Sequence, residues 1–286
     1  MHHDKNRNEK PLSLEERRAE FAQLPGASAS ILVEYNHRLY QFIRTDDGSP
    51  SLRMAAAHQR PEAMHHSGGA LSESLYIYGE AFEDWAKLTA SLIDNFRLAS
   101  VGLGLGYNEW IALALAIKAS RENQIEIDSF EDDKLLNETF LDFINDQNTR
   151  STALESQLTQ TFNDVLLQVA AATQVAPTIL KQLGQKLIAT GRWAVRGRLD
   201  FETQIASPYS VIFYDAFSGK ATPELWSEEF LVHFMKFTRP ICVFSTYAAT
   251  AALKRALKHH GFQITNARGF NGKRESTRAL RYGTVI

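Results

Sequence analysis

The sequence holds a single cysteine, Cys242, and it has no long apolar run. One cysteine excludes an internal disulfide and any zinc or iron–sulfur site that needs several thiolates, and it fits a reducing compartment. No stretch approaches the roughly 18 to 20 apolar residues that a membrane-spanning helix requires. The first residues are polar and charged, so they lack the apolar centre of a signal peptide. We therefore expect a cytoplasmic protein without a membrane segment.

An excess of charge of either sign is also missing. The 286 residues include 31 Lys and Arg against 33 Asp and Glu, which gives a net charge of −2. With this balance the chain has no net positive charge to attract nucleic acid, so any binding of nucleic acid must depend on a local basic patch. The C-terminal end supplies one, because the cations from Lys254 to Arg281 are opposed by Glu275 alone.

The order of predicted elements indicates an α/β protein with a small β-rich N-terminal piece. We expect a flexible tail over 1–25, a β-rich segment over 26–95 and a Rossmann-like core over 96–286. A short helix capped by Ser13 is expected near the end of the tail. In the β-rich segment, strands are expected at 28–33, 39–44 and 75–78, with a turn at 45–50.

The core begins with an expected strand at 96–101 and continues with one at 124–127, which ends at Asp128. From about 132 to 190 the apolar residues recur only at helical spacing, so this range is predicted to be a helical insertion. Residues 210–214 form a continuous apolar run, which is typical of a buried parallel strand. Further strands are expected at 193–195 and 241–245, helices at 83–92, 227–236 and 248–259, and a final hairpin from 262 to 282.

Three glycines follow the first core strand at strict alternation: Gly102, Gly104 and Gly106. Glycine lets the backbone turn sharply and approach a ligand, and the helix that follows points its free N–H groups at that ligand. A dinucleotide site would instead have Gly-x-Gly-x-x-Gly. The alternation, with Asp128 about twenty residues later to accept hydrogen bonds from ribose hydroxyls, is typical of an S-adenosylmethionine site. The alternative is a glycine-rich turn without a ligand and a solvent-facing Asp128.

Asp215 directly follows the apolar strand and should face the same cleft as the glycine turn. There a carboxylate can orient a nucleophilic nitrogen or accept its proton during methyl transfer, which needs no metal. The alternative is an aspartate that caps a strand-to-helix turn. The adjacent histidines at 65–66 and 259–260 cannot both face one metal ion, and we expect them to be ordinary surface residues.

The segment 269–275 holds two glycines, an aromatic residue and two adjacent cations, Lys273 and Arg274. This combination suits contacts with phosphates or stacked bases, although exposed basic hairpins are common.

Three segments together resemble the MnmC-type family, the tRNA 5-aminomethyl-2-thiouridine methyltransferases. Residues 64–82 resemble the segment before the family's methyltransferase core. The stretch from Tyr214-Asp215-Ala216-Phe217-Ser218 to Pro223-Glu224-Leu225-Trp226 resembles its Asp-Ala-Phe signature, with Gly219 where a proline is usual. Gly269-Phe270 with Gly272-Lys273-Arg274-Glu275 resembles its terminal Gly-Phe-Gly-x-Lys-Arg-Glu element.

The resemblance implies an S-adenosylmethionine-dependent methyltransferase that acts on the wobble uridine of tRNA. Bifunctional members carry a fused flavin-dependent oxidase domain; this chain resembles a stand-alone methyltransferase, with a separate oxidase acting upstream. The resemblance assigns the cofactor to Gly102, Gly104, Gly106, Asn108 and Asp128, with Asp200 as the nearest candidate for the adenine contact. It assigns catalysis to Asp215 and substrate binding to Phe217, Lys273 and Arg274.

Two other functions remain open at the level of sequence. The first is an enzyme of the same fold that transfers a methyl or aminopropyl group to a small amine and has no need of the basic hairpin. The second is a binding module that has kept the fold and lost the cofactor. Charge reversal in the hairpin would separate the first from an RNA enzyme, and titration with S-adenosylmethionine would identify the second.

Overall fold

The computed structural model describes residues 13–24, 31–55, 61–92, 94–147, 152–272 and 275–283. In its N-terminal part, helix α1 (Leu14–Ala22) precedes a four-stranded antiparallel sheet. Ser13 and Glu16 form the predicted capping box at the start of α1. The strands of this sheet follow chain order: β1 (Ile31–Tyr35), β2 (Arg38–Arg44), β3 (Pro50–Ala55) and β4 (Glu62–Ala63). The first two were predicted, whereas β3 and β4 were not.

A continuous helical stretch joins the small sheet to the core. It consists of α2 (Ala70–Ser74), the π-helical turn η2 (Leu75–Gly79) and α3 (Glu80–Leu88). The strand predicted at 75–78 is therefore wrong. A short apolar run does not distinguish a strand from a buried helix. Here Ile77 and Tyr78 are buried together with Ala81 and Phe82 one turn later, which is helical spacing.

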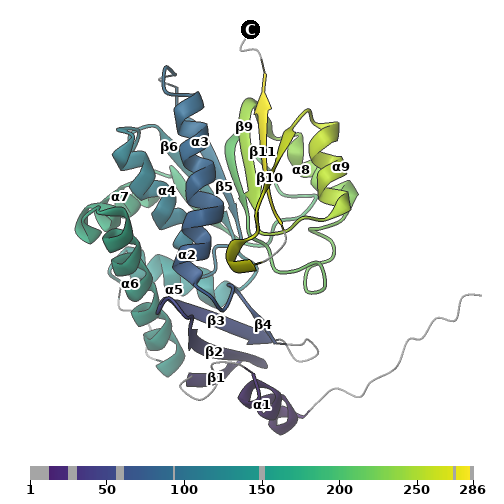
Figure 1. Cartoon of the computed structure of the whole chain (residues 1–286). Helices are drawn as coiled ribbons and strands as arrows, with labels where there is room; N and C mark the ends of the chain where they lie inside the picture. Colours follow the sequence, from purple (N-terminus) through teal and green to yellow (C-terminus); the bar gives the residue numbers. More distant parts are fainter. Residues whose placement is uncertain are drawn as a thin grey trace, which may run out of the picture.

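The large sheet has seven strands in the order β10-β11-β9-β8-β5-β6-β7 (Figure 1). Strands β5 to β9 run parallel, and the hairpin β10–β11 adds antiparallel strands at one edge. This arrangement confirms the predicted Rossmann-like α/β fold. The bounds are β5 (Phe96–Val101), β6 (Ile125–Phe130), β7 (Trp193–Arg196), β8 (Tyr209–Tyr214), β9 (Thr238–Thr246), β10 (Gln263–Ala267) and β11 (Ser276–Tyr282).

Both faces of the large sheet are covered, because alternate strand residues point to opposite sides. Leu98 and Val211 belong to one hydrophobic core, whereas their neighbours Ala99 and Ile212 belong to another. In Figure 1 the helices of the two cores lie to the left and to the right of the sheet. The first core contains α3, α4 (Tyr107–Lys118), α5 (Lys134–Ile144), α6 (Ala153–Thr173) and α7 (Pro177–Ala189); the second contains α8 (Glu228–Met235) and α9 (Ala251–His259).

Helices α5, α6 and α7 form the connection from β6 to β7 and occupy the range predicted to be helical. Helices α6 and α7 pack on α4. The division of the chain into a tail, a β-rich segment and a core remains a proposal. Within the described ranges, the helices lack the combination of length and apolar character that crossing a bilayer would need.

Candidate active site

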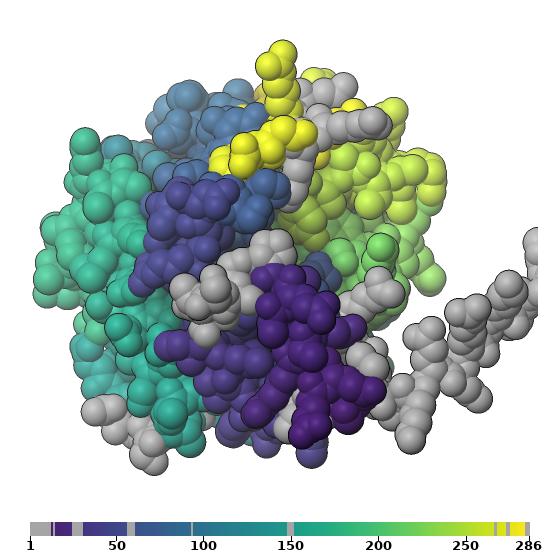
Figure 2. Space-filling model, turned by 60° about the horizontal axis from the view of Figure 1, so that its bottom comes forward, coloured from purple at the N-terminus to yellow at the C-terminus, as the bar shows by residue number. Residues whose placement is uncertain are grey.

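A cavity of about 400 Å³ lies at the carboxyl end of the parallel strands, where open α/β sheets bind their ligands. The small N-terminal sheet forms one wall and the core forms the others. Figure 2 shows the purple N-terminal segment between the teal helices and the green C-terminal half. The lining residues come from 62–67, Glu73, 101–104, Tyr107, Asn108, 130–132, Arg198, Leu199, 215–217, Thr222, Glu224, Leu225 and Tyr247.

The glycine turn forms the floor of this cavity. Gly102 and Gly104 line it, and their φ angles of +93° and +52° lie in the region that disfavours side chains. A Cβ at Gly102 would lie 2.5 Å from the carbonyl oxygen of Asp215. Gly106 sits behind the cavity wall at the N-cap of α4, where a Cβ would lie 2.7 Å from the ring of Phe140. The turn therefore needs glycine for close packing as well as for its backbone angles.

The structure brings Asp215, Asn108 and Phe217 to the same cavity as the glycine turn. Asp215 follows the last residue of β8, and its Oδ2 accepts a hydrogen bond of 2.9 Å from Nδ2 of Asn108, in the first turn of α4. The carbonyl oxygen of Phe217 accepts hydrogen bonds from Trp226 Nε1 at 2.6 Å and from Thr222 Oγ1 at 2.8 Å. All three predicted residues line the cavity, and these contacts hold their loop in place.

The structure does not place Asp128 in the cavity. Strand β6 continues to Phe130, so the strand end predicted at Asp128 is wrong. The Asp128 side chain is almost completely buried and is bound by ion pairs with Arg97 at 2.7 Å and Arg196 at 2.8 Å. The Tyr209 hydroxyl donates a further hydrogen bond to it at 2.7 Å. Both oxygens of Asp128 therefore have protein partners. These partners belong to β5, β7 and β8, so Asp128 links its own strand β6 to three other strands of the sheet.

The acid at the end of β6 is Glu131, which the sequence analysis missed. Its Oε2 accepts a hydrogen bond of 3.0 Å from the backbone N–H of Gly104, and its Oε1 accepts one of 3.0 Å from that of Asp133. Burial raises the pKa of Glu131 to about 7. Extending the predicted strand as far as Phe130, a residue type that favours strands, would have led to Glu131.

Of the remaining predicted site residues, Asp200 is described by the structure and does not line the cavity. Asp200 lies in an exposed turn, where its Oδ1 accepts hydrogen bonds from the Glu202 N–H at 3.0 Å and from the Thr203 hydroxyl at 2.9 Å. Arg198 and Leu199, just before it, line the cavity instead. Lys273 and Arg274 lie outside the described residues.

Residues 62–67, which comprise β4 and the first part of the loop toward α2, form a strap along the cavity. Glu62 accepts hydrogen bonds from the Ser218 N–H at 2.9 Å and from its hydroxyl at 3.0 Å. The sulfur of Met64 lies 3.2 Å from the position of a Cβ at Gly104. His65 and His66 also line the cavity, so the expectation of ordinary surface histidines is wrong for this pair. The strap contacts both the glycine turn and the loop after Asp215, which are remote from it in sequence.

The cavity is strongly acidic. Arg198 is the single Lys or Arg among the described lining residues, and it pairs with Glu224 at 2.7 Å. Burial and the nearby Asp215 raise the pKa of Tyr247, whose hydroxyl donates to the Ala216 carbonyl oxygen at 2.9 Å. Such a site favours ligands with positive charge. The lining carboxyl groups are Glu62, Glu73, Glu131, Asp132, Asp215 and Glu224.

The chain is similar to several known proteins. Residues 197–282 match the model of a family described as S-adenosyl-L-methionine-dependent methyltransferase. The chain is 26% identical over 211 residues, or 72% of its length, to the tRNA 5-methylaminomethyl-2-thiouridine biosynthesis bifunctional protein MnmC of Actinobacillus pleuropneumoniae. It is 38% identical over 65 residues to the MnmC of Hahella chejuensis. The chain covers 30% of the first relative and 10% of the second.

The fold has a solved counterpart in the crystal structure of MNMC2 from Aquifex aeolicus. The two share 21% identity and a TM-score of 0.55, with 94% of this chain and 77% of the other covered. The family match over 197–282 makes the chain similar to S-adenosylmethionine-dependent methyltransferases, and its fold and glycine turn are in keeping with that class. Within that class the chain is similar to MnmC-type enzymes, which confirms the resemblance predicted from the sequence.

Proposed function

We propose that the protein transfers a methyl group from S-adenosylmethionine to the aminomethyl nitrogen of a modified wobble uridine in tRNA. The observation behind this proposal is that the glycine turn and Asp215 share one cavity and touch through the backbone. The names of the relatives support the substrate, because they belong to the biosynthesis of 5-methylaminomethyl-2-thiouridine in tRNA. The single cysteine and the kind of substrate favour the cytoplasm as the place of reaction.

The residues on the floor of the cavity fit the cofactor. Gly102 and Gly104 leave the backbone open to a ligand, and the carboxyl group of Glu131 lies beside them. We assign to Glu131 the ribose contact predicted for Asp128, since Glu131 lines the cavity, whereas Asp128 is buried in the sheet and held by arginines and a tyrosine. When bound, the cofactor supplies a methyl group on a positively charged sulfur. The acidic lining stabilises that charge.

Asp215 is assigned to the acceptor amine. A primary amine is mostly protonated near neutral pH, so its nitrogen must lose a proton before its lone pair can form the new N–C bond. The sulfur keeps the electrons of the broken C–S bond, and the amine proton passes to Asp215. Asn108 donates to Oδ2 of Asp215 and so helps to orient the carboxylate toward the cavity. Phe217 remains a proposed contact for the uridine ring.

Lys273 and Arg274 remain proposed RNA contacts on the strength of the sequence alone. A separate flavin-dependent oxidase is the proposed upstream partner, because the aminomethyl group must be made before it can be methylated. Binding of the phosphate backbone by these cations would make the affinity for tRNA fall with increasing salt.

Mass spectrometry of tRNA nucleosides tests the proposal. A strain that lacks the gene should accumulate the unmethylated aminomethyl nucleoside. Purified protein with S-adenosylmethionine should then convert that tRNA to the methylated form in vitro. Unchanged tRNA in both experiments would overturn the proposal, and methylation of a small amine in its place would identify the alternative enzyme.

A further inference from the structure

Three aromatic side chains from distant parts of the sequence meet beside the cavity. The ring of Phe270, in the tip of the β10–β11 hairpin, lies 5.9 Å from that of His66 and 6.2 Å from that of Tyr76, measured between centroids. His66 lines the cavity, whereas Tyr76 belongs to the π-helical turn η2. The three rings therefore extend from the cavity wall outward along the protein surface.

The position of these rings follows from the strand directions. Strand β11 runs antiparallel to β9, and its first residues pair with the carboxyl end of β9. The hairpin tip thus lies at the same edge of the sheet as the cavity. In Figure 1 the tip stands next to α2. A Cβ at Gly68 would lie 2.0 Å from Nδ2 of Asn271, so the tip packs directly on the loop that follows His66.

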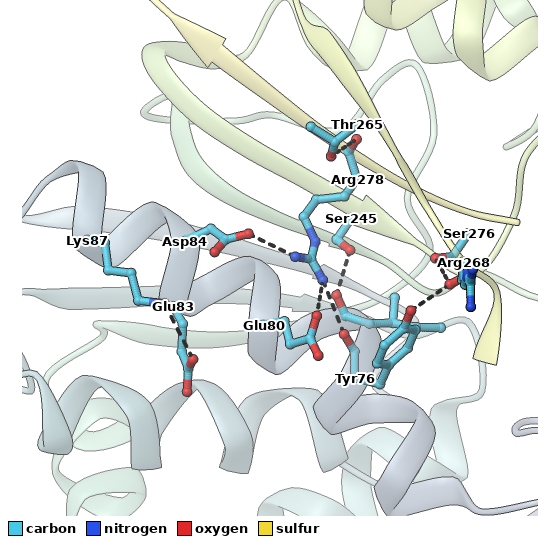
Figure 3. A network of polar contacts seen from close by, with 11 residues as sticks. Tyr76, Glu80, Glu83, Asp84, Lys87, Ser245, Thr265, Arg268, Ser276 and Arg278 are labelled. Atoms are coloured by element: carbon cyan, nitrogen blue, oxygen red, sulfur yellow. Dashed lines mark hydrogen bonds and ion pairs between the residues drawn. The ribbon is translucent and has the colours of Figure 1, made fainter. Parts of the chain in front are cut away.

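A network of polar contacts holds Tyr76 and the hairpin in place (Figure 3). The Tyr76 hydroxyl donates to the carbonyl oxygen of Arg268 at 2.9 Å, which ties η2 to the hairpin. Arg278 of β11 donates to the Tyr76 carbonyl oxygen at 3.3 Å and pairs with Glu80 and Asp84 at 2.8 Å each. A surface fixed in this way loses little conformational entropy when a ligand binds.

All three rings are partly exposed, so they combine a packed edge with area open to solvent. Partly exposed aromatic rings beside an enzyme cavity are suited to stacking with a planar group such as a nucleic-acid base. An enzyme that modifies a base in an RNA loop must draw that base out of its stack, which leaves the neighbouring bases without a stacking partner. Proteins commonly bind such bases by stacking them on aromatic side chains and imidazoles. The sequence adds Arg268, Lys273 and Arg274 to this hairpin, and their charge complements RNA phosphates.

We propose that His66, Tyr76 and Phe270 form a stacking platform for the base next to the modified uridine. The platform would hold the adjoining nucleotide of the anticodon loop while the aminomethyl group enters the cavity. This inference rests on the proposed function. It assigns to Phe270 a role in RNA affinity that is separate from cofactor binding and from proton removal at Asp215.

Substitution of Phe270 tests the platform. Phe270→Leu keeps an apolar side chain of similar bulk and removes the stacking ring, so the fold should be retained. We expect its affinity for a fluorescent anticodon stem-loop RNA to fall about 5- to 100-fold, the range that follows from the loss of one base stack. The KM for tRNA should rise in proportion, with kcat and the calorimetric affinity for S-adenosylmethionine unchanged. Phe270→Trp should retain wild-type affinity, because it keeps an aromatic face.

Tyr282→Ala is the matched control. Tyr282 is an exposed aromatic residue on the same hairpin, but it lies at the opposite end of β11 from the cavity. Its removal should leave RNA affinity unchanged. Wild-type RNA affinity in Phe270→Leu, or an equal loss in Phe270→Trp, would overturn the platform while leaving the proposed function intact. Failure of the wild-type protein to bind or methylate tRNA would instead overturn the proposed function.

Discussion

The two sides of the cavity are built in different ways. The proposed cofactor side comes from two short segments, 101–108 and 130–132, at the ends of neighbouring parallel strands. The proposed acceptor side gathers the strap 62–67, the loop after β8 and Tyr247 from three distant parts of the chain. Asn108 connects the two sides, since it begins α4 behind the glycine turn and donates to Asp215. A local motif can therefore specify the cofactor class, whereas the acceptor depends on the assembled fold.

Replacing Asp215 should give the largest loss of methyl transfer. It should affect the acceptor side and leave cofactor binding unchanged. Asp215→Asn keeps the shape of the side chain but removes the proton acceptor. We expect methyl transfer to fall about 10²- to 10⁴-fold, the usual contribution of a general base. Single-turnover transfer of labelled methyl measures this loss, and calorimetry should show cofactor affinity within about twofold of wild type, as expected for uniform cofactor binding. Wild-type turnover in this variant would remove Asp215 from the proposed mechanism.

Gly102→Ala should reduce both cofactor affinity and turnover. The new Cβ would meet the carbonyl oxygen of Asp215 at 2.5 Å, and the φ of +93° is unfavourable for alanine. Strain of this kind costs about 1 to 3 kcal/mol, so we expect cofactor affinity to fall roughly 10- to 100-fold, together with a loss of turnover. Gly197→Ala is the control, because a Cβ there meets nothing within 4 Å. Equal affinities in the two variants would contradict the close approach at Gly102.

Glu131→Gln should act on the cofactor side alone. Ribose hydroxyls that donate to Glu131 favour its ionised form, whereas the free protein holds its pKa at about 7. Below that pH a proton must leave before the cofactor binds, so wild-type affinity should rise between about pH 6 and pH 8. In Glu131→Gln the affinity should be about 10-fold lower at pH 8, as for one lost charged hydrogen bond, and nearly independent of pH. Calorimetric titration across this range is the measurement.

Asp128→Asn is the control for the Glu131→Gln prediction. Asp128 is paired with Arg97 and Arg196 inside the sheet, so its loss should lower the melting temperature. The pH dependence of cofactor binding should persist in this variant. If Asp128→Asn abolished that dependence and Glu131→Gln retained it, the assignment of the ribose contact to Glu131 would be wrong.

Glu62→Gln should have the smallest effect, and it should fall on the acceptor side. It weakens the contact between the strap and Ser218, where Glu62 accepts from both the N–H and the hydroxyl. We expect the KM for tRNA to rise about 3- to 10-fold, consistent with a partial loss of charge-assisted hydrogen bonding, while cofactor affinity stays constant. Steady-state kinetics with Ser218→Ala, which keeps the N–H donor, should show a smaller rise. A change confined to cofactor affinity would contradict the placement of the strap on the acceptor side.

Much of the core could be predicted because its signals are local. The apolar runs at 96–101 and 210–214 coincide with β5 and most of β8, and the helical spacing over 132–190 corresponds to α5, α6 and α7. The strand predicted at 75–78 is wrong because four apolar residues fit a buried helix equally well. Glu131 was not considered because the strand was predicted to end at Asp128, and the end of a strand is the least certain part of such a prediction.

The sequence by itself determined the class of site. Alternating glycines after an apolar strand and Asp215 after another require only short-range geometry, which a chain segment specifies through its own backbone preferences. Only the tertiary structure decided which residues surround the acceptor. It placed Met64 of the strap against the glycine turn and His65 and His66 in the cavity wall, and it put Glu131 in the cavity and Asp128 in an ion-pair cluster. Contacts between segments remote in sequence depend on how the sheets and helices pack, and no local pattern of residues encodes that packing.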